Sequence, residues 1–258
     1  MSAMVAVDAA SVRFGGGLLR RGQPFTALHA VSLEVPAGTA RGLVGESGSG
    51  KTTLGRAVLG LQPVTGGRVH VDGQDVSALR GAGLRSFRRR VQCVFQDSAA
   101  TLDPRMSLGA SIREGLDIHR IGDRDTREER VRDMLTRVGL PRHLAERYPH
   151  EISGGQRQRV NIARSLVLEP RVLIADEPVS ALDVSVQAQV LDLLADLRRE
   201  MGLTMLFISH DLMVVREVCD EVSVMHAGRI VETAATARLF HAPRHPMSAA
   251  LLEASGAV

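Results

Sequence analysis

The chain has 258 residues, of which 44% are hydrophobic and 24% are charged, and its formal net charge is +3. These values are typical of a globular protein with one large α/β domain, and no stretch approaches the roughly 20 apolar residues that span a bilayer. Because aromatic residues make up only 3% of the chain, the basic clusters at residues 20–21 and 85–90 have few base-stacking partners, so a nucleic-acid partner is not expected.

Two further features concern the cellular setting. The first five residues lack the basic and apolar regions of a secretory signal, so none is expected. Cys93 and Cys219 lie far apart, without a CxxC spacing or a histidine at ligand spacing. We expect both to be buried, reduced thiols of a cytosolic protein.

The first 44 residues are predicted to form mainly strands. Apolar and polar residues alternate over residues 4–14 and 28–35, which predicts two strands joined by a flexible basic loop. Pro36-Ala37-Gly38 is a turn, and the apolar run over residues 40–44 predicts a third strand. Helical spacing follows from Leu54 onward.

A phosphate-binding loop is predicted between that strand and that helix. Gly45 to Thr52 fits the G-x-x-x-x-G-K-[ST] pattern at every fixed position, and Lys51 is the only lysine among 32 Lys and Arg residues. A compact ammonium on a thin stem can lie along a phosphate chain inside a tight loop, unlike the broad guanidinium. Codon usage explains the abundance of arginine, but not why the one exception falls at this position. Thr52 offers a hydroxyl to Mg²⁺.

The remaining elements alternate between strands and helices. Asp72-Gly73 predicts a hairpin turn, residues 97–153 a helical insertion, and residues 237–254 two short helices. The other predicted strands cover residues 68–71, 91–95, 172–175, 204–208 and 222–225, and the other predicted helices cover residues 156–168, 185–200 and 212–218. This alternation predicts a doubly wound, mostly parallel sheet with its ligand chemistry at the carboxyl ends of the strands.

Polar residues follow three of these strands. Asp176 can hold Mg²⁺, and Glu177 can orient or deprotonate water facing a γ-phosphate. A merely solvated acidic pair is disfavoured because four apolar residues precede it. Gln96 can reach Mg²⁺ or water, and His210 can donate to the γ-phosphate, although each alone could be an ordinary surface residue.

A second anion-binding feature opens the helix over residues 156–168. Ser153 is a good N-cap, and Gly154 and Gly155 expose backbone N–H groups at the positive helix end. A plain helix cap is the simpler alternative. Two phosphate-binding features but one nucleotide loop suggest that each grips a different nucleotide in a dimer.

Together these motifs resemble the ATP-binding cassette (ABC) ATPases over nearly the whole chain. In that family two cassettes close head to tail, so Ser153 and Gly155 would contact the γ-phosphate held by the partner's loop. The resemblance implies catalysis by Glu177, His210 and Gln96, and Mg²⁺ binding by Thr52, Gln96 and Asp176. It implies ATP binding by Phe14, Gly45, Glu46, Ser47, Gly48, Ser49, Gly50, Lys51, Thr52, Thr53, Ser153, Gly154, Gly155, Gln156 and Asp183.

Longer strings narrow the subfamily. Residues 148–159, 176–189, 95–97, 102–105 and 243–246 resemble the oligopeptide, dipeptide and nickel uptake ATPases. The resemblance implies a second cassette, more often a different chain than a second copy, two transmembrane permease subunits, and an extracytoplasmic solute-binding protein that acts indirectly. It also implies a peripheral position on the cytoplasmic face of the inner membrane.

Four departures from that pattern stand out. Ile152 replaces a leucine in the signature, Ser98 replaces the proline after Gln-Asp, and Phe14 replaces the tyrosine that commonly stacks on adenine. The chain also lacks a Cys-rich extension after residues 243–246, so an iron–sulfur cluster is not expected.

The predicted fold is α/β: a P-loop NTPase (RecA-like) core with a mostly parallel sheet, an antiparallel β subdomain and a helical signature subdomain. We expect the core to cover residues 1–96 and 154–232, the helical subdomain about 97–153, and the tail 233–258. The predicted function is ATP hydrolysis coupled to uptake of peptides, nickel or a related solute. The alternatives are an ABC ATPase of DNA maintenance or translation, an exporter cassette, and a regulator that binds nucleotide without hydrolysis.

Overall fold

The structure is a computed structural model that describes residues 3–15, 25–96 and 101–256. The chain forms two compact units, unit 1 with residues 1–79 and 204–258 and unit 2 with residues 80–203. Each unit is described by itself. The basic pair Arg20-Arg21 and the departure at Ser98 lie outside the described residues.

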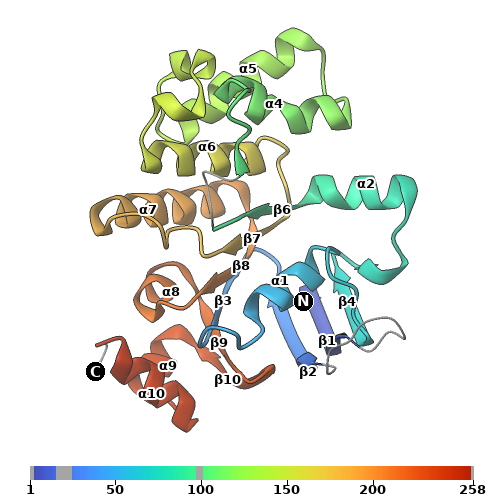
Figure 1. Cartoon of the computed structure of the whole chain (residues 1–258), viewed down its shortest axis with the longest axis vertical. Helices are drawn as coiled ribbons and strands as arrows, with labels where there is room; N and C mark the ends of the chain where they lie inside the picture. Colours follow the sequence, from blue (N-terminus) through green and yellow to red (C-terminus); the bar gives the residue numbers. More distant parts are fainter. Residues whose placement is uncertain (1–2, 16–24, 97–100, 257–258) are drawn as a thin grey trace. The chain divides into compact units, whose positions relative to one another are not determined.

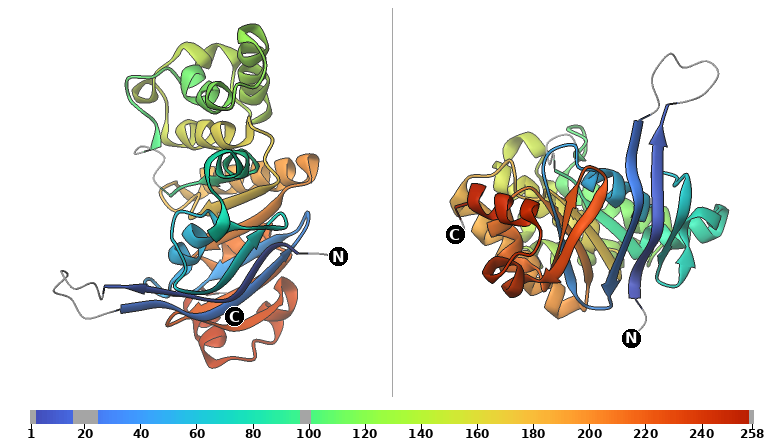
Figure 2. Two further views of the ribbon diagram at one scale, coloured as in Figure 1. Left: turned by 90° about the vertical axis from the view of Figure 1, so that its right-hand side faces the viewer. Right: turned by 90° about the horizontal axis from the view of Figure 1, so that it is seen from below.

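Unit 1 contains an antiparallel sheet with the strand order β2-β1-β4-β5. Its long strands β1 and β2 run side by side (Figure 2) and confirm the two strands predicted at the start of the chain. The predicted hairpin turn joins β4 to β5, with Asp72 and Gly73 both at positive φ, as a type I′ turn requires. The strands are β1 (Ala3–Phe14), β2 (Phe25–Pro36), β4 (Gly66–Val71) and β5 (Gln74–Asp75).

Unit 1 also contains the strand that precedes the phosphate loop. This strand, β3, is buried at every residue and pairs in parallel with β8 on one side and β9 on the other. A strand that is buried on both faces has a continuous run of apolar residues, and this run made β3 predictable from the sequence. The strands are β3 (Ala40–Val44), β8 (Thr204–Ser209), β9 (Glu221–His226) and β10 (Arg229–Ala235), the last of which is antiparallel to β9.

The helices of unit 1 follow these strands along the chain (Figure 1). Helix α8 packs against β3 so closely that a Cβ at Gly42 would lie 2.3 Å from Val215 Cγ1. The two short helices predicted in the tail are present as α9 and α10. The helices are α1 (Lys51–Val58), the 3₁₀ turn η1 (Val76–Ala78), α8 (Leu212–Val218), α9 (Thr236–His241) and α10 (Pro246–Ala254).

Unit 2 contains a parallel strand pair and three helices near it in the chain. The register of β6 and β7 runs from Val91 opposite Val172 to Val94 opposite Ala175. Ser165 of α6 donates a hydrogen bond of 2.8 Å to the Cys93 carbonyl, which fixes this helix on β6. The elements are α2 (Gly81–Arg90), β6 (Val91–Val94), α6 (Gly154–Leu166), β7 (Val172–Asp176) and α7 (Val184–Met201).

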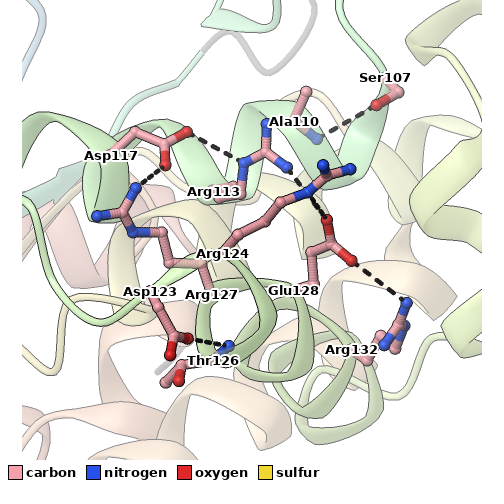
Figure 3. Close-up of polar contacts among 10 residues, drawn as sticks. All are labelled: Ser107, Ala110, Arg113, Asp117, Asp123, Arg124, Thr126, Arg127, Glu128 and Arg132. Carbon is pink, nitrogen blue, oxygen red and sulfur yellow. Dashed lines mark hydrogen bonds and ion pairs between the residues drawn. The ribbon is translucent and has the colours of Figure 1, made fainter.

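The rest of unit 2 is helical, as predicted. Ile112, Leu116 and Leu135 are fully buried, whereas Ile118 is exposed. Figure 3 shows the polar side of the same helices, where Asp117 accepts from both Arg113 at 3.0 Å and Arg127 at 2.8 Å. These pairs are partly exposed, so each contributes little to stability. The elements are α4 (Leu108–His119), α5 (Arg124–Arg137), η2 (Arg142–Glu146) and η3 (Pro149–Glu151).

Three features differ from the sequence expectations. Helix α2 and strand β10 are present but were not predicted. The expectation of two buried thiols is wrong for Cys93, which is only partly buried because β6 is an edge strand, whereas Cys219 is buried. Among the described helices, none combines the length and the apolar character of a membrane span.

Candidate functional site

The residues predicted to act on a nucleotide are divided between the two units. Unit 1 carries the phosphate loop, Phe14 and His210, and unit 2 carries the residues of the other motifs. The unit 2 residues are Gln96, Ser153, Gly154, Gly155, Gln156, Asp176, Glu177 and Asp183.

The phosphate loop closes around its lysine. The Nζ atom of Lys51 donates to the Gly45 carbonyl at 2.7 Å and to the Glu46 carbonyl at 2.8 Å, and the residue is only 6% exposed. The ammonium is therefore held inside the loop, at the first residue of α1, where the helix N-terminus adds a positive potential. The ammonium and the helix N-terminus together favour the binding of an anion.

Two glycines of the loop are required by its shape. Gly45 has φ 151°, and a Cβ there would lie 2.0 Å from the Met225 carbonyl oxygen. Gly50 has φ 106°, and its Cβ would lie 2.7 Å from the Ala27 carbonyl oxygen. Neither neighbour can yield, because both contacts are with backbone atoms. The loop thus needs glycine for close approach of the chain, not for flexibility.

The hydroxyl of Ser49 is a further polar group inside the loop. Ser49 is 4% exposed, and its Oγ makes no hydrogen bond within the described residues. A buried hydroxyl without a partner costs free energy unless a ligand completes it. A phosphate oxygen is the partner that the surrounding loop favours.

His210 leaves the sheet of unit 1 at the same edge as the loop. Val44 and Ser209, the last residues of β3 and β8, are direct partners in the parallel ladder. The residues that follow them, Gly45 and His210, therefore begin at the same end of the sheet. The strand β8 ends at Ser209, directly before the histidine, and Asp211 caps α8 by accepting from the Met213 N–H at 2.8 Å. His210 is exposed.

The acidic pair of unit 2 lies at the end of β7. Val94 and Ala175 are partners in the parallel ladder, so Gln96 and Glu177 follow neighbouring strand ends. The Gln96 Nε2 atom donates to Glu177 Oε2 at 3.0 Å, a contact between residues 81 positions apart. Glu177 also has φ 48°, a left-handed conformation that costs a non-glycine residue about 1–3 kcal/mol.

The signature residues form a capping box at the start of α6. Ser153 Oγ accepts from the Gln156 N–H at 3.3 Å, and Gln156 Oε1 accepts from the Ser153 N–H at 3.0 Å. The predicted N-cap is therefore confirmed. A Cβ at Gly155 would lie 2.6 Å from Val186 Cγ1 of α7, so the first turns of α6 and α7 touch at this glycine.

Asp183 caps the neighbouring helix α7. Its carboxylate accepts from the Ser185 hydroxyl at 2.7 Å and from the Val186 N–H at 3.0 Å. These two hydrogen bonds hold the pKa of Asp183 below its usual range, the bond from Ser185 having the larger effect. Asp183 thus fixes the helix that bears on Gly155.

Phe14 is the last residue of β1 and is 42% exposed. Its direct partner across the sheet is Phe25, the first residue of β2, which is 61% exposed. Sequence patterns single out Phe14 but not Phe25, because their pairing depends on a strand register that the sequence does not reveal.

The fold and the loop define the class of protein. A phosphate loop between a buried parallel strand and a helix is the nucleotide site of P-loop NTPases. The ABC transporter family matches residues 28–180, more than half of the chain. The chain belongs to this family, as one of its ATP-hydrolysing cassettes, and the family resemblance of the sequence motifs is confirmed.

Relatives of the chain carry names from peptide import. It is 46% identical over 252 residues to the oligopeptide transport ATP-binding protein OppF of Streptococcus mutans, covering 97% of this chain and 81% of that protein. It is 54% identical over 224 residues to a protein of Brucella ovis provisionally named a peptide import ATP-binding protein, covering 87% of this chain and 71% of that protein.

Solved structures of ABC cassettes share the fold. The cassette MJ0796, a dimer in a post-hydrolysis state bound to ADP and Pi, has a TM-score of 0.80 and 28% identity, covering 90% of this chain and 99% of that one. The cassette cbiO1 of Clostridium perfringens, part of the transporter complex cbiONQ, has a TM-score of 0.82 and 28% identity, covering 94% and 92%. The predicted fold class is confirmed.

Proposed function

We propose that this chain is the ATP-hydrolysing subunit of an importer that takes up peptides. The observation that carries the proposal is the intact phosphate loop, with Lys51 held inside it, in a chain 46% identical to OppF along nearly all of its length. The names of these relatives favour peptides over nickel.

Each predicted site residue has a role in this proposal. The loop from Gly45 to Thr53 binds the phosphates, and Lys51 exchanges its carbonyl partners for phosphate oxygens. Phe14 stacks on the base. Glu177 accepts a proton from the attacking water, Gln96 orients Glu177 through their hydrogen bond, and His210 donates to the γ-phosphate.

The donor atoms suit a magnesium ion. Thr52, Asp176 and Gln96 offer hydroxyl, carboxylate and amide oxygens, and Mg²⁺ prefers oxygen ligands of this kind. When bound, the ion would neutralise the charge that develops on the β- and γ-phosphates.

We place the chain in a cassette dimer. The capping box at Ser153 and the N–H groups of Gly154 and Gly155 form a second anion site, which would complete the nucleotide of a partner cassette. Asp183 belongs to the same contact. The partner is either a different cassette or a second copy, and the pair works beneath two permease subunits at the cytoplasmic face of the inner membrane, fed indirectly by a solute-binding protein.

Reconstituted transport tests the proposal. The chain is purified with the membrane subunits that accompany it, placed in vesicles, and supplied with ATP and a radiolabelled tripeptide. ATP-driven peptide uptake, absent in the Glu177→Gln variant, is the expected result. Uptake of radioactive Ni²⁺ instead of peptide would reassign the solute. Co-purification with nucleic acid and no membrane subunit would overturn the transport role.

A further inference from the structure

Two exposed phenylalanines pair across the strands at one end of the antiparallel sheet in unit 1. Phe14 and Phe25 are direct cross-strand partners. Such partners have Cβ atoms about 4.5–5.5 Å apart and lie on the same face of the sheet. The two side chains are 42% and 61% exposed.

The register shows which face of the sheet carries this surface. Val12 lies two residues before Phe14 on β1, so the two side chains share a face. A register shift between Val12 and Arg13 puts one extra residue on β2 at this point. Leu28 is the partner of Val12 and therefore lies on that face as well. Both Val12 and Leu28 are 0% exposed, so the apolar face is covered at these residues and open at the two phenylalanines.

The covered part of this face packs against the phosphate loop. Leu28 Cδ2 lies 3.0 Å from the position of a Cβ at Gly50. Two backbone hydrogen bonds extend the attachment: the His29 N–H donates to the Gly228 carbonyl at 2.9 Å, and the Gly228 N–H donates to the Ser49 carbonyl at 3.0 Å. Strand β2 is thus fixed to the loop, and Phe25 lies only three residues before Leu28.

We propose that Phe25 joins Phe14 in a two-ring platform on which the base of the bound nucleotide stacks. This inference rests on the proposed function, in which the phosphate loop of unit 1 binds ATP. The occupant is a nucleobase because the open face continues directly from the loop that holds the phosphates. Stacking on an aromatic ring is favourable for every base, since each has a π-face.

The platform has a consequence for specificity. Phenylalanine has no hydrogen-bonding group in its side chain, so two such rings read the face of a base and not its edge. Loss of Phe25 should therefore weaken the binding of ATP and of GTP to the same degree. It should not change the binding of inorganic tripolyphosphate, which has the phosphates and no base.

Calorimetric titration of the full chain tests this role. For Phe25→Ala, we expect the Kd for ATP to rise about 5- to 10-fold, with the Kd for tripolyphosphate unchanged. Phe25→Tyr keeps a π-face and should retain wild-type affinity for ATP. Phe25→Leu keeps apolar bulk without the ring, so its affinity for ATP should fall. Leu61→Ala removes another exposed apolar side chain of unit 1, beyond the far end of α1, and should change nothing.

Three results would overturn the inference. An unchanged ATP affinity in Phe25→Ala would reduce the pair to an ordinary cross-strand contact. Full affinity in Phe25→Leu would remove the need for a ring. If Phe25→Ala lost affinity for tripolyphosphate as much as for ATP, the substitution would be acting on the phosphate loop and not on the base. If the wild-type chain bound tripolyphosphate but not ATP, or neither, the proposed function would fail as well, so the two failures are distinguishable.

Discussion

The phosphate loop of unit 1 and the acidic strand end of unit 2 are built in different ways. The loop is shaped by backbone: Gly45 and Gly50 lie against carbonyl groups, and Lys51 is buried among them. The acidic end is shaped by side chains, with Gln96 exposed and donating to Glu177. From this difference we predict that the loop supplies most of the affinity for the phosphates, and that the Gln96–Glu177 pair supplies turnover.

The largest effect is expected at Glu177. Glu177→Gln keeps the shape and an oxygen that can accept from Gln96, but removes the base, so ATP turnover should fall at least about 100-fold while ATP binding persists. Turnover is measured with the partner subunits present. Glu200→Gln, an exposed carboxylate on α7, is the control. Unchanged turnover would reject the catalytic role of Glu177.

The complementary change lies at Lys51. Lys51→Ala removes a buried, hydrogen-bonded charge, and the Kd for ATP should rise about 10- to 100-fold. Equilibrium titration of the full chain measures it. Arg56→Ala removes an exposed cation from the same helix and should leave the Kd unaltered. If Lys51→Ala lost turnover but kept its affinity for ATP, the assignment of the loop to phosphate binding would be wrong.

A smaller effect is expected where α6 and α7 touch. Gly155→Ala places a methyl group against Val186, which should destabilise unit 2 by about 1–3 kcal/mol through overpacking. Thermal unfolding measures the change. The double variant with Val186→Ala should recover part of the lost stability. Equal melting temperatures in the single and double variants would show that this contact is not the cause.

The smallest effect concerns pH and Asp183. Because its pKa is lowered in the folded chain, Asp183 contributes stability above the usual aspartate pKa, and that contribution disappears as the pH falls through the lowered value. Asp183→Asn keeps a cap but cannot titrate. The melting temperature of the wild type should exceed that of the variant near neutral pH and approach it in acid. A constant difference at all pH values would contradict this prediction.

The sequence predicted most of the strands and the motifs, because both depend on local patterns. Helix α2 was missed because its ten residues carry only two large apolar side chains, Leu84 and Phe87, of which Phe87 is buried. Strand β10 was missed since it buries Glu232, an acid that a strand pattern places outside. The structure explains that burial: Glu232 accepts from the backbone N–H groups of Arg244 and His245.

The candidate site was predictable as a set of residues but not as a set of contacts. The loop follows a fixed spacing, so its residues could be named from the sequence. The hydrogen bond from Gln96 to Glu177 and the approach of Gly155 to Val186 join distant segments. The pairing of Phe14 with Phe25 depends on register. Such relations follow from tertiary packing, which no linear spacing encodes.

The solitary lysine also makes this protein unusually simple to follow by chemical labelling. Apart from an α-amino group at the chain terminus, Lys51 is the only primary amine that an acylating reagent can modify. The rate of acylation, measured by mass spectrometry, would thus report the accessibility of the Lys51 ammonium, which is 6% exposed in the structure. Any nucleotide that covers it should slow the labelling. The fraction of the chain that carries one acyl group on Lys51 would then report how much of the loop is occupied by nucleotide.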